Sequence, residues 1–411
     1  MTGRTQNCRF CGDALAAPVL DLGEQPFSNS YVVPGQEALE RRYPLRICVC
    51  ETCLLVQTDY DAPADEIFSA DYAYFSSYST TWVEHAKAYA QRMISRFGLG
   101  AQSLVVEVAS NDGYLLQHFV ASGVPVLGVE PTNGTAAAAV AKGIPTRVEF
   151  FGERFARGLC AETGGVDLIA ANNVLAHVPD IADFTRGFAA LLKPEGVATF
   201  EFPHVQRLIE GLQFDTIYHE HYSYLSLHAV ETIFKAAGLR IFDVEELSTH
   251  GGSLRVYAAL EGSDHAPGER VAQLLAQERE AGLHTPQGYA ALGARVGAVR
   301  DGFLSMLQGA KADGKLVAAY GAAAKGNTFL NYCGVGARDI AFVADANVAK
   351  QGKLLPGSHV PIVSPAALLA RRPDYVVILP WNIKDEVALQ MAGIRDWGGK
   401  FVTAIPALEV F

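Results

Sequence analysis

The sequence contains no apolar run of about 18 residues or more, the length that is needed to cross a bilayer. Its first residues, MTGRTQNCRF, also lack the apolar stretch of a signal peptide. We therefore predict no membrane partner and a location in the cytoplasm, where thiols are kept reduced. Basic residues are in deficit, with 33 Lys and Arg against 44 Asp and Glu and a net charge of −11. Because nucleic-acid binding relies on a basic surface, we predict no nucleic-acid partner either.

The rest of the composition is that of a folded protein with several domains. Half of the 411 residues are hydrophobic and 19% are charged, which excludes general disorder. At about 150 residues per domain, the length indicates two to three domains. Changes of pattern along the chain predict domains at residues 1–70, 71–262 and 263–411.

Five of the seven cysteines fall within the first 53 residues. Two C-x2-C pairs, Cys8 with Cys11 and Cys50 with Cys53, each offer two thiolates from one tight turn, as tetrahedral zinc requires. Cys48 is a competing ligand. Four thiolates leave no open position on the metal, so we predict a structural zinc. The alternatives are ordinary buried thiols and a redox pair, for which a single C-x2-C would suffice.

From residue 103, apolar strand patterns alternate with helical patterns, which predicts a parallel α/β sheet. The domain ends differently, because a short Gly-containing turn joins residues 240–247 to residues 253–260. Two strands joined in this way are antiparallel neighbours. A parallel sheet closed by such a hairpin is typical of class I methyltransferases. The expected parallel strands are residues 103–109, 124–130, 144–150, 166–172 and 196–202.

A second α/β unit follows a segment of long polar helices at residues 263–311. The predicted fold class is thus α/β, with a class I, Rossmann-like sheet between an N-terminal zinc-binding lobe and a C-terminal second Rossmann-like domain. The expected strands of the second unit are residues 315–321, 340–347, 375–381 and 400–406.

The segment VVEVASNDGYLL, residues 105–116, is a strand that ends in an acid, then a small-residue turn and a helix. It is similar to the first motif of S-adenosylmethionine enzymes, commonly E/D-x-G-x-G. Ala109 and Asn111 stand where glycine is usual, and only the last glycine is kept. The residues expected to bind this cofactor are Glu107, Ala109, Asp112 and Gly113.

The second strand also ends in an acid, Glu130, followed by Pro131. A carboxylate at that point of an open α/β sheet can accept hydrogen bonds from both ribose hydroxyls of a nucleoside. The alternative is a glutamate that only caps a helix or meets solvent. We expect the acid and the aromatic residue after the third strand, Glu149 and Phe150, to contact the adenine. Two asparagines, Asn172 and Asn173, end the fourth strand at the same edge of the sheet.

Residues 218–221 place a phenol, two imidazoles and a carboxylate in consecutive positions. They follow the fifth strand, at the sheet edge where the cofactor is expected. Such groups can remove a proton, orient a base and stabilise an oxyanion. A solvated surface loop is the alternative, and the H-E-H spacing does not offer HExxH zinc chemistry. A further histidine, His177, follows the fourth strand at the same edge. The candidate catalytic residues are therefore His177, Tyr218, His219, Glu220 and His221.

The segment YGAAAKGNT, residues 320–328, predicts a strand, a small-residue turn and a helix N-terminus. Backbone N–H groups at such a terminus can bind an anion. Gly321 opens the turn, Lys325 adds a point charge suited to a pyrophosphate, and Asn327 follows on the helix. The motif is neither a Walker A nor a GxGxxG. Tight strand–helix packing is the alternative explanation.

Together these motifs resemble one family closely, the sugar-nucleotide C-methyltransferases that act on C3 of dTDP-4-keto deoxysugars. The resemblance covers essentially the whole chain and comprises both C-x2-C pairs, YAYFSS, EVASNDG, NNVLAHVP, the Y-H-E-H run, HGGSLR and GAAAKGNT. It implies S-adenosylmethionine and structural zinc as cofactors, and a dTDP-4-keto deoxysugar bound between the central and C-terminal domains. The family roles carry onto Tyr72, His177, Tyr218, Glu220 and His221, and the aromatic stretch adds Tyr78 to the substrate site.

The implied chemistry begins with removal of the C3 proton beside the ketone, while hydrogen-bond donors hold the C4 oxygen. The carbanion-like C3 then attacks the sulfonium methyl. We assign His221 as the base and Glu220 as the neighbour that tunes or positions it. Tyr218 and His177 are candidate donors to the ketone oxygen, and Tyr72 orients the sugar.

Two matters stay open at this point. His219 is the rival base, since it shares a face with His221 in an extended segment but not in a helical turn. Two other functional classes also remain, a nicotinamide-dependent sugar-nucleotide oxidoreductase or epimerase and a non-catalytic zinc-binding adaptor.

Overall fold

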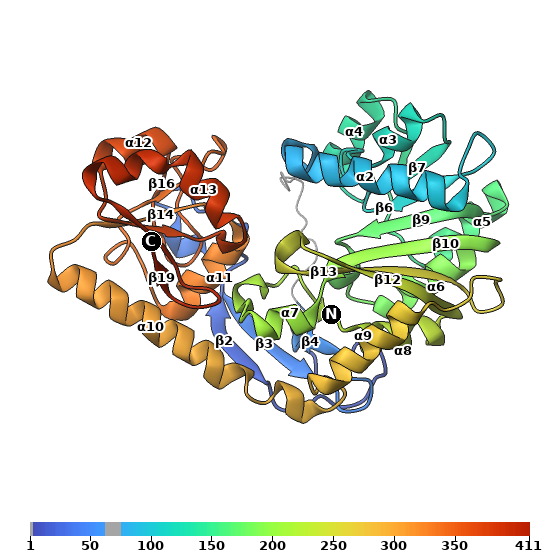
Figure 1. The fold of residues 1–411 in the computed structure, drawn as a ribbon, viewed down its shortest axis with the longest axis horizontal. Coiled ribbons are helices and arrows are strands. Elements are labelled where there is room, and N and C mark those ends of the chain that lie inside the picture. Colours follow the sequence, from blue (N-terminus) through green and yellow to red (C-terminus); the bar gives the residue numbers. More distant parts are fainter. Residues whose placement is uncertain (1–2, 62–74) are drawn as a thin grey trace.

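The computed structural model describes residues 3–61 and 75–411, which form three packed parts (Figure 1). The central domain and the C-terminal domain lie on opposite sides of the view, and the N-terminal lobe, in blue, lies between and beneath them. Among the residues described, no helix is both long enough and apolar enough to cross a membrane.

The N-terminal lobe is built on a four-stranded sheet that includes a strand from the central part of the chain. In the order β11-β4-β3-β2, β11 pairs antiparallel with β4, with Tyr224 opposite Val56. Because β11 comes just after residues 218–221 in the chain, its pairing with β4 attaches this segment to the N-terminal lobe. The elements are β1 (Gly3–Arg4), β2 (Leu20–Gln25), η1 (Glu37–Leu39), β3 (Tyr43–Val49), β4 (Val56–Thr58), β5 (Tyr60–Asp61) and β11 (Ser223–Tyr224).

The central domain contains a seven-stranded sheet of order β12-β13-β10-β9-β6-β7-β8. The pairs from β10 to β8 are parallel, whereas β13 is antiparallel to both β10 and β12. The predicted closing hairpin is therefore confirmed. The strands are β6 (Val105–Val108), β7 (Val126–Val129), β8 (Thr146–Arg147), β9 (Val166–Asn172), β10 (Leu192–Pro203), β12 (Leu239–Leu247) and β13 (Ser253–Leu260).

Alternate residues of the central strands pack on opposite faces of the sheet, because side chains alternate along a strand. Val105 and Leu168 pack with one group of helices, and Val106 and Ile169 pack with the other. The first group is α2 (Thr80–Phe97), α3 (Leu116–Ala121) and α4 (Asn133–Ala141). The second group is α5 (Glu153–Thr163), α6 (Ile181–Leu191), α8 (Leu227–Ala236) and α9 (Glu269–Glu280).

The C-terminal domain has a six-stranded sheet of order β16-β15-β14-β17-β18-β19, parallel except for the last pair. The second predicted α/β unit is thus present. Its strands are β14 (Val317–Tyr320), β15 (Val343–Ala344), β16 (Ile362–Val363), β17 (Tyr375–Ile378), β18 (Lys400–Thr403) and β19 (Glu409–Val410). The helices are α10 (Leu292–Ala312), α11 (Ala324–Cys333), α12 (Pro365–Arg371) and α13 (Lys384–Gln390), with η6 (Pro286–Tyr289), η7 (Trp381–Ile383) and η8 (Ala392–Trp397).

One apolar core joins the N-terminal lobe to the C-terminal domain. Leu45 and Ile47 of the lobe belong to the same buried cluster as Phe303 of α10 and Val377 of β17. Residues that carry the site therefore lie on parts that pack against each other. The remaining short elements are η2 (Ser76–Tyr78), η3 (Leu175–His177), α7 (Val205–Glu210), η4 (Phe214–Thr216) and η5 (Thr249–Gly251).

Candidate functional site

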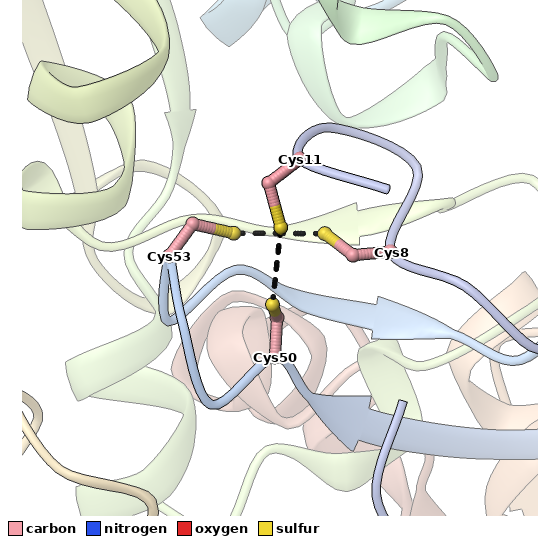
Figure 2. Close-up of side chains that lie close together, drawn as sticks. All are labelled: Cys8, Cys11, Cys50 and Cys53. Atoms are coloured by element: carbon pink, nitrogen blue, oxygen red, sulfur yellow. Dashed lines mark hydrogen bonds between the residues drawn. The ribbon is translucent and has the colours of Figure 1, made fainter. Parts of the chain in front are cut away.

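The four cysteines of the two C-x2-C pairs converge on one point, as Figure 2 shows. Their Sγ atoms all lie within 4.8 Å of one another, with 3.5 Å from Cys8 to Cys53 and 3.4 Å from Cys11 to Cys50. Four thiolates at about 2.3 Å from a zinc ion lie about 3.8 Å apart, so the donor set fits one tetrahedral zinc. Cys48 is buried in β3 and does not belong to this group.

Each cysteine pair lies in a turn closed by a backbone hydrogen bond. Gly12 N donates to Cys8 O at 3.0 Å, and Leu54 N donates to Cys50 O at 2.9 Å. Both Gly12 and Leu54 have a positive φ, which turns the chain sharply and brings the two thiols of a pair together. The hydrogen bond from Cys53 lowers the pKa of Cys8 to about 4, so this position favours the thiolate that a metal binds.

The turn after β6 has left-handed backbone positions at residues that are not glycine. The φ angles are 56° at Ala109 and 51° at Asn111, with 78° at Gly113. Such conformations are uncommon for other residues and cluster at ligand sites. A Cβ on Gly113 would clash with the side chain of Ile144, so a glycine is required there. The turn therefore has the backbone conformation that glycines usually adopt, although Ala109 and Asn111 stand where two of these glycines are usual.

Glu130 joins this turn to the one after β7. Its Oε2 accepts from Asn111 N and its Oε1 from Thr132 N, each at 2.9 Å, and the residue is 5% exposed. Each carboxylate oxygen can accept a further hydrogen bond, so the group can still hold two ribose hydroxyls. The neighbouring Pro131 is partly exposed beside it.

Unpaired polar atoms at this sheet edge fit a polar cofactor. A buried donor or acceptor without a partner costs free energy, and a bound ligand removes that cost. Burial also raises the pKa of Glu107 well above its usual value. The buried atoms without a hydrogen-bond partner in the described part of the chain include Glu107 Oε2, Ser110 Oγ, Asp112 Oδ1 and Asn172 Oδ1.

Asp112 is a predicted cofactor-binding residue, and one of its carboxylate oxygens accepts hydrogen bonds from other side chains of the protein. Its Oδ2 accepts a hydrogen bond from Lys142 Nζ at 3.0 Å and another from the hydroxyl of Ser77. The backbone N–H of Ser76 donates to Asn111 Oδ1 at 2.9 Å. The short helix η2 thus covers the cofactor turn, and Asp112 holds it there.

The predicted aromatic substrate residues precede α2. Tyr78 lies in η2, is 78% exposed and stacks on Phe75 at 5.3 Å between ring centroids. It is adjacent to the segment that contacts the cofactor turn. Tyr72 lies outside the described residues, so its assignment stays a prediction.

The two residues predicted for adenine lie at an open hollow at the end of β8. Its lining includes Glu149, Phe150, Arg154 and Asp183. Phe150 is 72% exposed, so its ring is available to a ligand. β8 is the neighbour of β7, after which Glu130 lies, and this is the side expected for the base of a nucleoside.

We predict that Glu130→Ala weakens binding of S-adenosylmethionine by roughly 1.5–3 kcal/mol, the worth of hydrogen bonds to a charged acceptor. Titration calorimetry measures the affinity. Because the carboxylate also holds the backbone of Asn111 and Thr132, Glu130→Gln serves as a milder variant, and thermal unfolding separates lost binding from lost structure. An unchanged affinity in both variants would remove Glu130 from the site.

Three of the predicted catalytic side chains come together beside the ends of β9 and β10. The ring of His221 lies 4.1 Å from that of Tyr218 and 4.6 Å from that of His177, centroid to centroid. Nδ1 of His221 is 2.9 Å from the carbonyl oxygen of Thr216. A carbonyl only accepts, so Nδ1 carries the proton and Nε2 carries the lone pair.

The side chains of His219 and Glu220 point away from this cluster. Residues 218–221 form a turn closed by a 2.9 Å hydrogen bond from His221 N to Tyr218 O, so neighbouring side chains diverge. Nε2 of His219 is 3.2 Å from Pro44 O in the N-terminal lobe. The helical-turn alternative therefore holds, and the geometry favours His221 over His219 as the base.

Glu220 was predicted to tune or position His221, and its carboxylate is bonded to the N-terminal lobe. Its Oε1 accepts a 2.5 Å hydrogen bond from Asn29 in the N-terminal lobe, and burial raises its pKa to about 7. The carbonyl of Thr216 orients His221 instead. Asn29 lies 191 residues away along the chain, and no sequence signal marks it as a partner.

Lys325 lies in the first turn of α11, at the junction with the central domain. Its Nζ donates to Asn382 Oδ1 at 2.7 Å and lies 4.9 Å from the ring centroid of Trp381. Burial lowers the pKa of Lys325, and the carboxylate of Asp215 opposes that shift. Trp381 Nε1 donates to Asp215 Oδ2 at 2.8 Å, so these residues link the two domains.

The predicted anion site at the turn after β14 is only partly present. The N–H of Ala322 donates to Asp345 Oδ2 at 2.7 Å, and the N–H of Ala323 donates to Gly321 O at 2.9 Å. These two amides are therefore occupied, and a carboxylate lies where an anion was expected. A Cβ on Gly321 would clash with Pro380, so this glycine serves packing.

Asn327 was also predicted to bind substrate, but the structure assigns it to packing between domains. It is 1% exposed, and its Nδ2 donates to Ser28 O at 2.6 Å. The hydroxyl of Thr328 donates to Ile217 O at 2.9 Å, next to the turn of residues 218–221. α11 therefore contacts both the N-terminal lobe and the segment that leads into this turn.

Three family models together match most of the chain. A zinc binding domain matches residues 8–68, a methyltransferase domain matches residues 82–244 and a C-methyltransferase C-terminal domain matches residues 248–406. Among curated proteins, the C-methyltransferase NovU of Streptomyces niveus is 36% identical over 404 residues, which is 98% of this chain and 96% of NovU.

Solved structures match a smaller share of the chain, at lower identity. An S-adenosylmethionine-dependent methyltransferase from Clostridium acetobutylicum is 13% identical with a TM-score of 0.36, covering 48% of this chain and 96% of its own. The magnesium protoporphyrin IX methyltransferase of Synechocystis PCC 6803 is 15% identical with a TM-score of 0.33, covering 43% and 78%.

Proposed function

The chain belongs to the C-methyltransferase family, and we propose that it transfers a methyl group from S-adenosylmethionine to C3 of a dTDP-linked 4-keto deoxysugar. It has the class I S-adenosylmethionine methyltransferase fold, a zinc-binding domain and a Rossmann-like C-terminal domain. The sugar nucleotide and the position of methylation are what the resemblance to the sugar-nucleotide C-methyltransferases implies, and the chemistry of the site is compatible with them.

The observation that carries this proposal is the tautomer and packing of His221. A hydrogen on a carbon beside a ketone is acidic enough to remove only when a base and an oxyanion donor act together. Nδ1 of His221 is bonded to Thr216 O, which directs the basic character to Nε2. The phenol of Tyr218 lies against the same ring.

In the proposed reaction, His221 Nε2 takes the C3 proton and becomes an imidazolium, whose Nδ1–H is held by the carbonyl of Thr216. The electron pair moves onto the ketone oxygen, which Tyr218 stabilises as a hydrogen-bond donor. S-Adenosylmethionine, when bound, supplies the electrophilic methyl group. Burial keeps the pKa of His221 well below its usual value, with a smaller effect from His177, so the base is neutral at cellular pH.

Burial lowers the pKa of His177 to about 4, and the backbone of Glu220 opposes that shift. The rings of Tyr218 and His177 lie 4.1 Å and 4.6 Å from that of His221, centroid to centroid, so both stay candidate donors to the ketone oxygen.

Incubation with isotopically labelled S-adenosylmethionine and a panel of dTDP-4-keto sugars tests the proposal by mass spectrometry. We expect one labelled methyl group on carbon in at least one sugar. A parallel incubation with NADH tests the nicotinamide-dependent alternative. Label on an oxygen or nitrogen atom, reduction of the ketone by NADH, or no product with any 4-keto sugar would contradict the proposal.

We predict that Lys325→Ala raises the KM for the sugar nucleotide about 10-fold or more, because a hydrogen bond to a charged group is worth about 1.5–3 kcal/mol. The KM for S-adenosylmethionine should change much less, and steady-state kinetics with each substrate varied measures both. Lys384→Ala is the matched control, since Lys384 pairs with Glu409 at the surface of the same domain. An equal effect on both substrates would make Lys325 a packing residue.

A further inference from the structure

The turn between β12 and β13 has three consecutive residues with positive φ. The angles are 54° at His250, 89° at Gly251 and 119° at Gly252. Because β13 is antiparallel to β10, with Ser253 opposite Pro203, this turn lies at the carboxyl end of β10. It therefore stands at the sheet edge that carries the site.

Packing explains the two glycines of this turn. A Cβ on Gly251 would lie 2.6 Å from the ring of Trp381, and one on Gly252 would lie 2.7 Å from the side chain of Arg207. Packing does not explain His250, whose side chain is exposed rather than part of a core. A left-handed position is held more easily by Gly or Asn, so an imidazole here carries a conformational cost.

The imidazole of His250 is held in one orientation. Asn173 Nδ2 lies 3.2 Å from His250 Nε2 and donates to it, and the indole of Trp82 lies 5.4 Å away, centroid to centroid. Asn173 itself has a φ of 53° and directly follows β9, four residues before His177. With Nε2 accepting, the proton of a neutral ring lies on Nδ1.

The groups around His250 favour its neutral form. Removal from water and then the charge of Lys325 lower its pKa, and His85 acts in the same direction. Glu201 acts in the opposite direction, but its carboxylate is bonded to Arg255 at 2.6 Å and to His85 at 2.9 Å. His250 also lowers the pKa of His221, which places the two rings within electrostatic reach of each other.

We propose that His250 is a further catalytic residue, whose Nδ1–H donates a hydrogen bond to the sugar oxygen that becomes negative when His221 removes the C3 proton. The inference rests on the proposed function. Oxyanions are commonly held by two donors, and Tyr218 supplies one. His250, whose Nε2 accepts from Asn173 and whose proton therefore lies on Nδ1, supplies the second. His250 keeps its proton throughout, and the C3 proton goes to His221.

The test uses His250→Gly in the full-length protein, because glycine accepts the left-handed backbone and removes only the imidazole. We expect unchanged zinc content, unchanged affinity for S-adenosylmethionine and a melting temperature at or above that of the wild type. We expect kcat and the C3 hydrogen–deuterium exchange rate to fall about 10²- to 10³-fold, as for loss of one oxyanion donor, with KM changed little. Added imidazole should restore part of the rate.

His359→Gly is the matched control, because His359 also has a positive φ, 52°, and its ring is bonded to Glu40 of the N-terminal lobe. Its kinetics should equal those of the wild type. A kcat of His250→Gly within about 2-fold of the wild type, or a rise in KM alone, overturns the role of His250. If His250→Gly is unstable, His250→Asn replaces it with the same expectations. Absence of exchange and methylation in the wild-type protein overturns the proposed function itself.

Discussion

His221→Asn should lower the rate of C3 hydrogen–deuterium exchange by about 10²- to 10⁴-fold, the contribution of a positioned general base. The asparagine amide can still donate to the carbonyl of Thr216, so the turn should keep its shape while Nε2 is lost. The measurement omits the methyl donor: enzyme, S-adenosylhomocysteine and a dTDP-4-keto sugar are incubated in heavy water. The enzyme-free rate is subtracted, since such ketones also exchange slowly alone.

Two neighbouring variants sharpen this result. Tyr218→Phe should slow exchange without abolishing it, because it removes an oxyanion donor and leaves the base. His219→Asn should exchange at close to the wild-type rate, since His219 contacts Pro44 and Tyr43 in the N-terminal lobe. Normal exchange in His221→Asn with loss in His219→Asn would show that His219 is the base.

The pH dependence of the C3 hydrogen–deuterium exchange rate should reflect the protonation of His221. A base acts when it is unprotonated, which means above its pKa, and burial holds the pKa of His221 well below the usual value of about 6.5. The exchange rate should therefore stay level as the pH falls from 8 to 6. A rate that halves near pH 6.5 would indicate an imidazole with an ordinary pKa and would contradict the assignment.

Cys50→Ser should remove the zinc and unfold the N-terminal lobe. Elemental analysis should give about one zinc per wild-type chain and none in the variant. Structural zinc sites bind with apparent free energies of about 10–16 kcal/mol, which is comparable to the whole stability of a domain. Thermal unfolding should show the loss directly.

The same variant should be inactive, because the zinc-binding turns support the strand next to His221. Cys50 and Cys53 lie in the turn that joins β3 to β4, and β4 pairs with β11, which begins two residues after His221. Cys48→Ser is the control, since Cys48 lies in β3, two residues before Cys50, but outside the cluster, and it should keep the zinc. Zinc kept in Cys50→Ser and lost in Cys48→Ser would show that the ligand set is wrong.

Features that depend on neighbouring residues were predictable from the sequence. The C-x2-C turns, the acids that end β6 and β7 and the hairpin of β12 and β13 follow from spacing and periodicity over a few positions. The turn after β6 also has a left-handed form despite Ala109 and Asn111. In each case the local backbone brings the relevant groups together by itself, so no distant contact is needed.

The tertiary structure alone decided which way the functional side chains point. The side chains of the four consecutive residues 218–221 point in two directions, because Glu220 is hydrogen-bonded to Asn29 and His221 to the carbonyl of Thr216. In the C-terminal domain, the backbone N–H of Ala322 was expected to bind an anion, but it donates a hydrogen bond to the side chain of Asp345. The direction of a side chain in a turn depends on a few dihedral angles, and partners far away in the sequence fix those angles, so only the folded chain determines them.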